Sequence, residues 1–217
     1  MPQKLIDGVH RFQAEEFGRY SELFQRLSRE GQHPHTLFIT CSDSRILAEL
    51  ITQSQPGDLF VVKNIGNIVP PVDAVGSTNS TAAAIEYAVG EIGVQDVVVC
   101  GHSQCGAMTT LMSKEQERLN TPERQHLRAW LQVAAPVREI MERSYTHLFD
   151  DVDAMLNAAA EENVLFALEN LKAYPSVRRR LEEGSLHLHG WFFKIATGEL
   201  FNYDPGLKQF VKLVKPA

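Results

Sequence analysis

The stretch TLFITCSDSR, residues 36–45, joins an apolar run of strand length to five residues that carry a thiol, two hydroxyls, a carboxylate and a guanidinium. Cys41 therefore lies at the end of an expected buried strand, two residues before Asp43 and four before Arg45. A carboxylate and a guanidinium are rarely buried without a partner, because an unpaired charge is costly to remove from water. The stretch predicts a strand whose carboxyl end carries a polar site.

Two further apolar runs of strand length follow, at residues 59–63 and 96–101. Like residues 36–40 they do not alternate with polar residues, which is typical of strands buried on both faces of a parallel sheet. Helix-like stretches lie between the runs, at residues 46–53 and 81–92. The order strand, helix, strand, helix, strand favours a right-handed α/β layer, so we expect an α/β fold.

The two ends of the chain differ from this central part. Apolar residues recur at helical spacing through the first thirty residues, which predicts one or two amphipathic helices. From residue 106 to about residue 182 the pattern is again helical. Residues 185–196 then alternate and lead through a Thr197–Gly198 turn into residues 200–203, as expected for a late hairpin or an edge strand.

Composition limits the class of protein. The chain has 217 residues, 44% of them apolar and 22% charged, with a net charge of −6. The basic run Arg178–Arg180 is followed within three residues by two glutamates and predicts a solvated helix face, so no nucleic-acid partner is expected. No linker or internal repeat divides the chain. We predict a single domain over residues 1–217, with an N-terminal helical arm at 1–30 and a C-terminal edge strand and tail at 183–217.

Cysteine usage and the N-terminus bear on location. Three cysteines in a chain of this length do not make a disulfide framework, and the odd number also favours a reducing compartment. The first residues, MPQKLIDGVHRFQ, have no apolar core after their charged start, unlike a secretory signal. No run approaches the roughly 18 apolar residues that a membrane helix needs. We therefore expect a cytoplasmic protein without a membrane partner.

A second stretch of chemical interest, CGHSQCGAM at residues 100–108, also follows a predicted strand. Two residues separate His102 from Cys105, so both side chains can reach one metal ion from a single loop. Because ligands of an open parallel sheet bind beyond the carboxyl ends of its strands, Cys41 can join them there. Two thiolates and one imidazole suit zinc, and three protein ligands leave a fourth position for water, as in catalytic zinc sites.

Other interpretations of these residues stay open at this point. Buried cysteine commonly serves as a small apolar residue, and an H-x-x-C spacing alone is a weak signal. A structural zinc site would need a fourth cysteine or histidine. Cys100 is expected to face the core, and packing or hydrogen bonding is expected for the other histidines considered. These are His33, His35, His187 and His189.

Asp43 and Arg45 favour a catalytic site over a structural one. A free carboxylate two residues after a ligand would bind the metal and close its open position. The arginine can hold that carboxylate in a bidentate pair, which keeps it ionised and away from the metal. Zinc lowers the pKa of bound water towards about 7, and Asp43 can then orient the resulting hydroxide towards an electrophile. A cap for a helix that begins near Ile46 is the alternative role for Asp43.

The sequence resembles the β-class carbonic anhydrases, in particular their plant-like and cyanobacterial branches, over nearly its whole length. The shared motifs are CSDSR (41–45), QPGDLFVVKN (55–64), GNIVPP (66–71), AIEYAV (84–89), GHSxCGAM (101–108) and HGW (189–191). The resemblance implies one Zn²⁺ per chain on Cys41, His102 and Cys105, with Asp43 and Arg45 as the catalytic pair. It also implies a mainly parallel central β-sheet flanked by helices, and an N-terminal arm that forms a homodimer, with dimers able to assemble further.

Further site residues carry over from the family by position. Gln32 matches a glutamine that donates a hydrogen bond to the substrate across the dimer. Phe60, Ile65 and Tyr87 match the apolar wall of the pocket, and core packing is their alternative role. Gly106 fits a turn where the backbone passes close to the site.

The sequence departs from the family pattern at two places near the site. Asn79–Ser80, within residues 75–84, stands where many members have two glycines, so the conformation of a loop beside the pocket is in question. Lys63 stands where members commonly have arginine.

The function implied by the resemblance is the reversible hydration of carbon dioxide to bicarbonate and a proton by zinc-bound hydroxide. The expected location is the cytoplasm, or the carboxysome if the source is a cyanobacterium. A hydrolase of carbonyl sulfide or carbon disulfide is the rival enzyme, because these substrates are similar linear electrophiles. A zinc-bound inactive scaffold or assembly protein is the third alternative. Asp43, Arg45 and Gln32 argue against it, whereas Asn79–Ser80 keeps it open.

Overall fold

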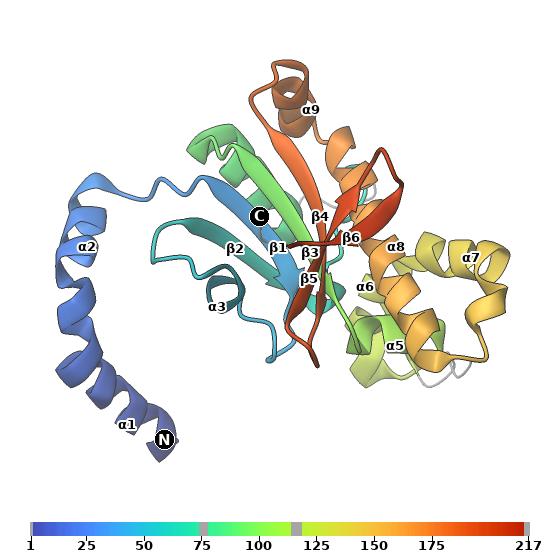
Figure 1. Cartoon of the computed structure of the whole chain (residues 1–217), viewed down its shortest axis with the longest axis horizontal. Helices are drawn as coiled ribbons and strands as arrows, with labels where there is room; N and C mark the ends of the chain where they lie inside the picture. The colour runs from blue at the N-terminus through green and yellow to red at the C-terminus, as the bar shows by residue number, and fades with distance from the viewer. Residues whose placement is uncertain (1, 74–77, 114–118, 215–217) are drawn as a thin grey trace.

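The computed structural model describes residues 2–73, 78–113 and 119–214. Its described strands form one six-stranded sheet in the order β2-β1-β3-β4-β5-β6 (Figure 1). The strands are β1 (Thr36–Cys41), β2 (Leu59–Asn64), β3 (Asp96–His102), β4 (His187–Lys194), β5 (Glu199–Asp204) and β6 (Gln209–Lys212). The α-helices are α1 (Gln3–Arg11), α2 (Phe17–Glu30), α3 (Ala48–Thr52), α4 (Ser80–Glu86), α5 (Gly106–Met112), α6 (Gln125–Gln132), α7 (Ala135–Ser144), α8 (Val152–Ala173) and α9 (Pro175–Glu182).

Short helical turns of other types also occur in the described part of the chain. They are the π-turns η1 (Phe12–Glu16) and η3 (Tyr87–Ile92) and the 3₁₀ turns η2 (Ile65–Asn67), η5 (Pro122–Arg124) and η6 (Thr146–Leu148). The long C-terminal helical region is interrupted at a proline, because α8 ends at Ala173 and α9 begins at Pro175. No helix among the described residues combines the length and the apolar character needed to cross a membrane.

Parallel pairing dominates the sheet. β1 pairs in parallel with β2 and β3, and β3 pairs in parallel with β4. β4, β5 and β6 then pair antiparallel, which confirms the predicted late hairpin and adds β6 as the edge strand. The predicted α/β fold with a mainly parallel central sheet is therefore confirmed.

Both faces of β1 are buried, and this explains why residues 36–40 do not alternate. Leu37 and Ile39 pack into a core that includes residues of α4, α8 and α9. Phe38 points to the other face, where it packs with Ala48 of α3 and with the partly buried Trp191. All six residues of β1 are buried.

Helix α8 packs closely on the sheet where two glycines face it. A Cβ at Gly101 would come within 2.9 Å of Val164 Cγ2 and 3.1 Å of the Ala160 carbonyl oxygen. A Cβ at Gly190 would come within 3.0 Å of both Val164 and Leu168. Glycine inside a strand commonly marks such a close approach, and here it allows α8 to pack against β3 and β4.

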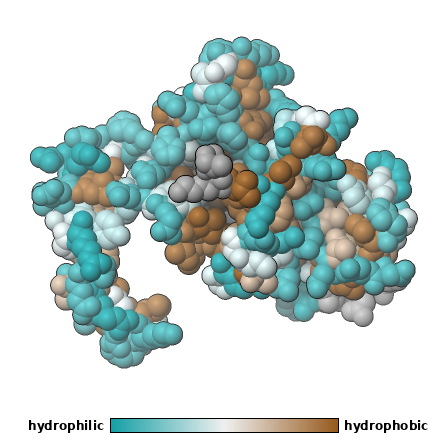
Figure 2. Space-filling view, viewed as in Figure 1, coloured by the Kyte–Doolittle hydropathy of each residue, from teal (hydrophilic) through white to brown (hydrophobic). Residues whose placement is uncertain are grey.

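The N-terminal helices form an arm that extends away from the sheet (Figure 1). No residue of α1, η1 or α2 is buried. Hydrophobic surface is nevertheless visible along the arm in Figure 2. Its large apolar residues with more than a third of their surface exposed are Leu5, Val9, Phe12, Phe17 and Tyr20.

Glu161 on α8 gives the fold a pH dependence. Burial raises the pKa of its carboxyl to about 7, against the opposing effect of nearby Lys194. Because its pKa is higher in the folded than in the unfolded protein, ionisation of Glu161 destabilises the fold as pH rises from about 4.5 to 7. Glu161→Gln should therefore raise Tm by a few degrees at pH 8 and by less at pH 5, as measured by thermal unfolding.

The matched control is Glu169→Gln, an exposed position on the same helix that pairs with Lys172. It should leave the pH dependence of Tm as in the wild type. A Glu161→Gln shift of the same size at pH 5 and pH 8 would contradict the assignment.

Candidate metal centre

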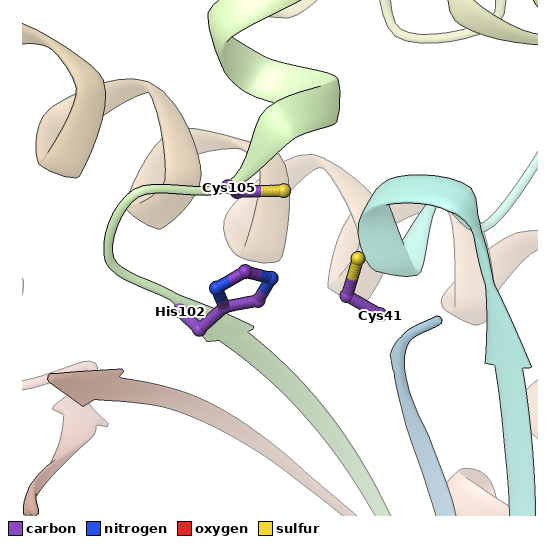
Figure 3. A group of neighbouring side chains, drawn as sticks. All are labelled: Cys41, His102 and Cys105. Atoms are coloured by element: carbon purple, nitrogen blue, oxygen red, sulfur yellow. The ribbon is translucent and has the colours of Figure 1, made fainter. Parts of the chain in front are cut away.

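Three potential metal ligands converge at the carboxyl edge of the sheet. Cys41 ends β1, His102 ends β3, and Cys105 precedes the first turn of α5. Figure 3 shows both sulfur atoms and the imidazole ring turned towards one space. One ligand atom from each residue lies within 4.8 Å of the other two, and all three side chains are buried.

The hydrogen bonding of His102 fits a metal ligand. Its Nδ1 lies 2.9 Å from the carbonyl oxygen of Ser103, which can only accept, so Nδ1 carries the proton. Nε2 then presents a lone pair, and this buried atom has no hydrogen-bond partner among the described residues. A buried polar atom of this kind needs a partner, and a lone pair beside two thiols is the donor set that zinc prefers.

The two thiols differ in their ionisation. Hydrogen bonds lower the pKa of Cys41 to about 4. The largest effect comes from the Cys105 thiol, and smaller ones come from His102 and from backbone N–H groups, including that of Gly66. The interaction with Cys41, together with burial, raises the pKa of Cys105. One thiolate therefore forms readily, whereas the second is favoured only when a cation neutralises the pair.

Asp43 and Arg45 form the predicted bidentate pair. Arg45 Nε donates to Asp43 Oδ1 at 2.9 Å, and Arg45 Nη2 donates to Oδ2 at 2.8 Å. These bonds hold the pKa of the Asp43 carboxyl well below its usual range. Arg45 Nη2 also donates to the Gln104 carbonyl at 3.2 Å, which links the pair to the loop between His102 and Cys105.

Asp43 does not cap helix α3, which was its alternative role. α3 begins at Ala48, and its N-cap is Leu47, which makes no side-chain capping bond. Asp43 Oδ1 instead accepts the backbone N–H of Arg45 at 2.9 Å, in a local turn. The carboxylate is therefore held by the arginine backbone as well as by the guanidinium.

Lys63 of β2 supports the same turn through hydrogen bonds to its backbone. Its ammonium group donates to the Ile46 carbonyl at 2.7 Å and to the Asp43 carbonyl at 3.3 Å. These two bonds link β2 to the first and last residues of the turn from Asp43 to Ile46. A lysine fulfils this role because the acceptors are two carbonyl oxygens and not a planar carboxylate.

A cavity of about 330 Å³ lies beside these ligands. It is lined by Cys41, Ser42, Asp43, Ile65, Gly106, Ala107, Thr110, Leu127 and Leu131. Among the residues predicted for the site, the cavity brings together Cys41, Asp43, Ile65 and Gly106. Its wall is largely apolar, as the sequence analysis expects for Ile65.

Gln32, Phe60 and Tyr87 do not line this cavity. Phe60 is four residues before Asn64, which pairs with Cys41, so it lies roughly 13 Å back along the strands. Its ring packs against that of Tyr87 with the centroids 5.9 Å apart. Gln32 is exposed between α2 and β1. A role for these three residues in catalysis would require a site that they reach on another chain.

Helix α6 contributes wall residues that sequence reasoning missed. Leu127 and Leu131 line the cavity, and Trp130 Nε1 donates to the Ile65 carbonyl at 2.8 Å. The spacing of these three residues marks an apolar helix face. Nothing in the sequence indicates that this face lies against the metal site, because the contact joins segments 65 residues apart.

Asn79, which replaces a family glycine, is the N-cap of α4. Its Oδ1 accepts the backbone N–H of Ala82 at 3.0 Å. Asparagine is among the preferred N-cap residues, so this departure has a local structural reason. Residues 75–77 of the same run lie outside the described part of the chain.

The histidines outside the centre and Cys100 have the structural roles that were expected. His189 Nε2 lies 2.8 Å from Asp96 Oδ1, and His33 Nε2 lies 3.0 Å from the Glu30 carbonyl. Cys100 is fully buried on the opposite face of the sheet from the α8 core, and burial raises its pKa to about 12.

Comparison with known proteins gives consistent matches. The family described as carbonic anhydrase matches residues 36–200. A carbonic anhydrase from Synechocystis sp. is 41% identical over 96% of this chain and 73% of its own length. One from Pseudomonas aeruginosa is 41% identical over 97% of this chain and 91% of its own length.

Solved structures agree with these relatives. The β-carbonic anhydrase CcaA is 41% identical, with a TM-score of 0.91 over 97% of this chain and 98% of that one. A tetrameric β-carbonic anhydrase from Sordaria macrospora is 31% identical, with a TM-score of 0.77 over 92% of this chain and 95% of its own. The similarity thus extends from sequence to fold.

Replacing one ligand should remove the metal. Cys41→Ser is expected to reduce zinc from one ion per chain to a small fraction of that, because a neutral hydroxyl is a poor substitute for a thiolate. Metal content after dialysis against zinc-free buffer is the measurement. Cys100→Ala, a buried cysteine on the other face, is the matched control and should retain zinc. Full zinc retention by Cys41→Ser would refute this ligand set.

Proposed function

The chain belongs to the β-class carbonic anhydrases, and on this basis we propose that it catalyses the reversible hydration of carbon dioxide to bicarbonate and a proton at a zinc ion held by Cys41, His102 and Cys105. The observation that carries the proposal is the bidentate Asp43–Arg45 pair beside three convergent ligands. A structural zinc site would have no use for an ionised carboxylate that is held beside the metal without being one of its ligands.

Each residue has a defined task in this proposal. Zinc, when bound, would act as a Lewis acid and lower the pKa of a water molecule bound to it to about 7. His102 keeps its proton at Nδ1 on the Ser103 carbonyl, so that Nε2 stays free to bind. Arg45 holds Asp43 ionised, and Asp43 accepts a hydrogen bond from the attacking water and thereby fixes its orientation.

The cavity wall suits the proposed substrate. Ile65, Leu127 and Leu131 present hydrocarbon, which excludes competing charged groups and accommodates uncharged carbon dioxide. The same wall accommodates carbon disulfide, so an assay has to compare the two substrates directly. The buried free thiols of Cys41, Cys100 and Cys105 need a reducing environment, and we therefore place the protein in the cytoplasm.

Stopped-flow measurement of carbon dioxide hydration with a pH indicator tests the proposal. Asp43→Asn should lower kcat by on the order of a hundredfold while zinc stays bound, because the amide cannot orient the attacking water as the carboxylate does. Arg179→Ala, an exposed arginine on α9, is the control and should leave kcat unchanged. A zinc-loaded wild type that hydrolyses carbon disulfide and does not hydrate carbon dioxide would favour the rival enzyme. Loss of both activities would favour an inactive scaffold.

We further propose that the arm completes the enzyme by pairing with a second chain. A monomer would leave the apolar residues of α1, η1 and α2 in water, although such contiguous exposed apolar surface usually marks an interface. Gln32, Phe60 and Tyr87 would then serve the site of the neighbouring chain, which accounts for their distance from the cavity of their own chain. The tetrameric fungal relative is in keeping with assembly beyond one chain.

Charges introduced on the arm should weaken this dimer. Val9→Asp combined with Phe12→Asp is expected to raise the dimer Kd at least tenfold, because each apolar side chain buried in an interface contributes about 1.5–3 kcal/mol. Sedimentation velocity across a dilution series measures the change, and activity should fall in parallel. Gln13→Asp, a polar and exposed position on the arm, is the control. A fully active monomer would disprove the role of the second chain.

A further inference from the structure

The turn η2, residues Ile65–Asn67, lies directly against Cys41. Gly66 has a φ of 79° and Asn67 a φ of 46°, so two successive residues are in the left-handed region. A Cβ at Gly66 would come within 2.8 Å of Ala107 Cβ, and glycine is therefore required. This conformation directs the Gly66 N–H towards the Cys41 sulfur, at an N···S distance of 3.4 Å.

Two side chains from distant helices hold the turn. Trp130 Nε1 on α6 donates to the Ile65 carbonyl at 2.8 Å. Asn163 Nδ2 on α8 donates to the Gly66 carbonyl at 2.9 Å. The peptide groups on both sides of the Gly66 Cα are thus each held by a hydrogen bond from outside the turn.

The bond from Trp130 acts on the same peptide group that faces the sulfur. The Ile65 carbonyl and the Gly66 N–H belong to one planar trans peptide, so they point in opposite directions. The indole N–H fixes the carbonyl end, and the N–H end donates to Cys41. A hydrogen bond accepted by the carbonyl also polarises the peptide and strengthens its N–H as a donor. The result is a continuous path from Trp130 through one peptide to the sulfur.

Packing alone does not account for these polar contacts. Asn163 is 1% exposed, and its Oδ1 has no hydrogen-bond partner among the described residues. An apolar side chain in its place would leave the buried Gly66 carbonyl without the hydrogen bond that Asn163 Nδ2 donates. Together with the bond from Trp130, this contact fixes the direction of the Gly66 N–H.

We propose that Trp130 is a positioning residue of the metal centre, which holds the Gly66 N–H on the Cys41 sulfur through the Ile65–Gly66 peptide and thereby slows the loss of zinc. The inference rests on the proposed function in one respect, namely that Cys41 binds zinc. The N–H bond keeps the sulfur oriented towards the metal and stabilises its negative charge. Partners that orient a ligand in this way typically contribute 10–100-fold to metal affinity.

Release of zinc from the holoenzyme to an excess of chelator tests the inference. Trp130→Phe keeps an aromatic ring and removes the N–H donor, and zinc release should become on the order of tenfold faster. The second tryptophan of the chain provides the matched control. Trp191 packs against Phe38 on the other face of the sheet, with the ring centroids 5.8 Å apart, so Trp191→Phe should leave the rate unchanged.

A spectroscopic measurement separates positioning from general loosening of the fold. In the cobalt-substituted protein, the thiolate-to-metal charge-transfer band reports the environment of the sulfur. Trp130→Phe should shift this band, whereas Trp191→Phe should not. Identical zinc release and identical cobalt spectra in Trp130→Phe and the wild type would overturn the inference.

The wild type itself decides the question if Trp130→Phe does not fold. In the ¹¹³Cd-substituted protein, a scalar coupling between the metal and the Gly66 amide proton passes through the N–H···S hydrogen bond. Detection of this coupling supports the Gly66–Cys41 end of the path, and its absence overturns the inference. A wild type that retains zinc and does not hydrate carbon dioxide would overturn the proposed function alone. A wild type that binds no zinc would overturn both.

Discussion

The parallel pairing of β1 with β3 places the carboxyl ends of two sequence-distant strands side by side. Thr40 is the register partner of Cys100, so Cys41 and His102 leave the sheet at the same edge. Neighbouring strands are about 4.8 Å apart, which is close to the separation that two ligands of one metal need. The loop after β3 then only has to return Cys105 to that edge. The metal centre is thus a consequence of strand register.

Such a concentration of thiols requires control of charge. The Cys41 thiolate forms readily but opposes the ionisation of Cys105 in the same buried space, and a divalent cation resolves this conflict. Asp43 adds a further negative charge at the rim, and Arg45 neutralises it through two hydrogen bonds. Lys63 holds the backbone of the same segment from β2. Each potential anion of the site thus has a specific partner, and the Asp43 carboxylate is kept separate from the ligands.

The sequence predicts the parts of the fold and the site that depend on local pattern. The unbroken apolar run of β1 indicates a strand covered on both faces, and the spacing of His102 and Cys105 indicates a shared metal. The two-residue spacing of Asp43 and Arg45 indicates that their side chains pair. The structure has the buried strand, the convergent His102 and Cys105, and the Asp43–Arg45 pair that these patterns indicate.

Contacts between remote segments were not predictable in this way. Leu127 and Trp130 reach the site because α6 folds back over the turn after β2, and no motif marks that event. Phe60 and Tyr87 illustrate the reverse case, because their family positions suggest a pocket wall while their own chain places them away from the cavity. Only knowledge of the assembly relates such positions to a site.

The glycines under α8 couple helix packing to the metal. Gly101 and Gly190 set the height of α8 above β3 and β4, and Asn163 on that helix reaches the turn beside Cys41. A Cβ at Gly190 would lie 3.0 Å from the Val164 and Leu168 side chains, so α8 would have to yield by a few tenths of an ångström next to Asn163. A redesign of this core for thermal stability would therefore also alter the surroundings of the metal centre.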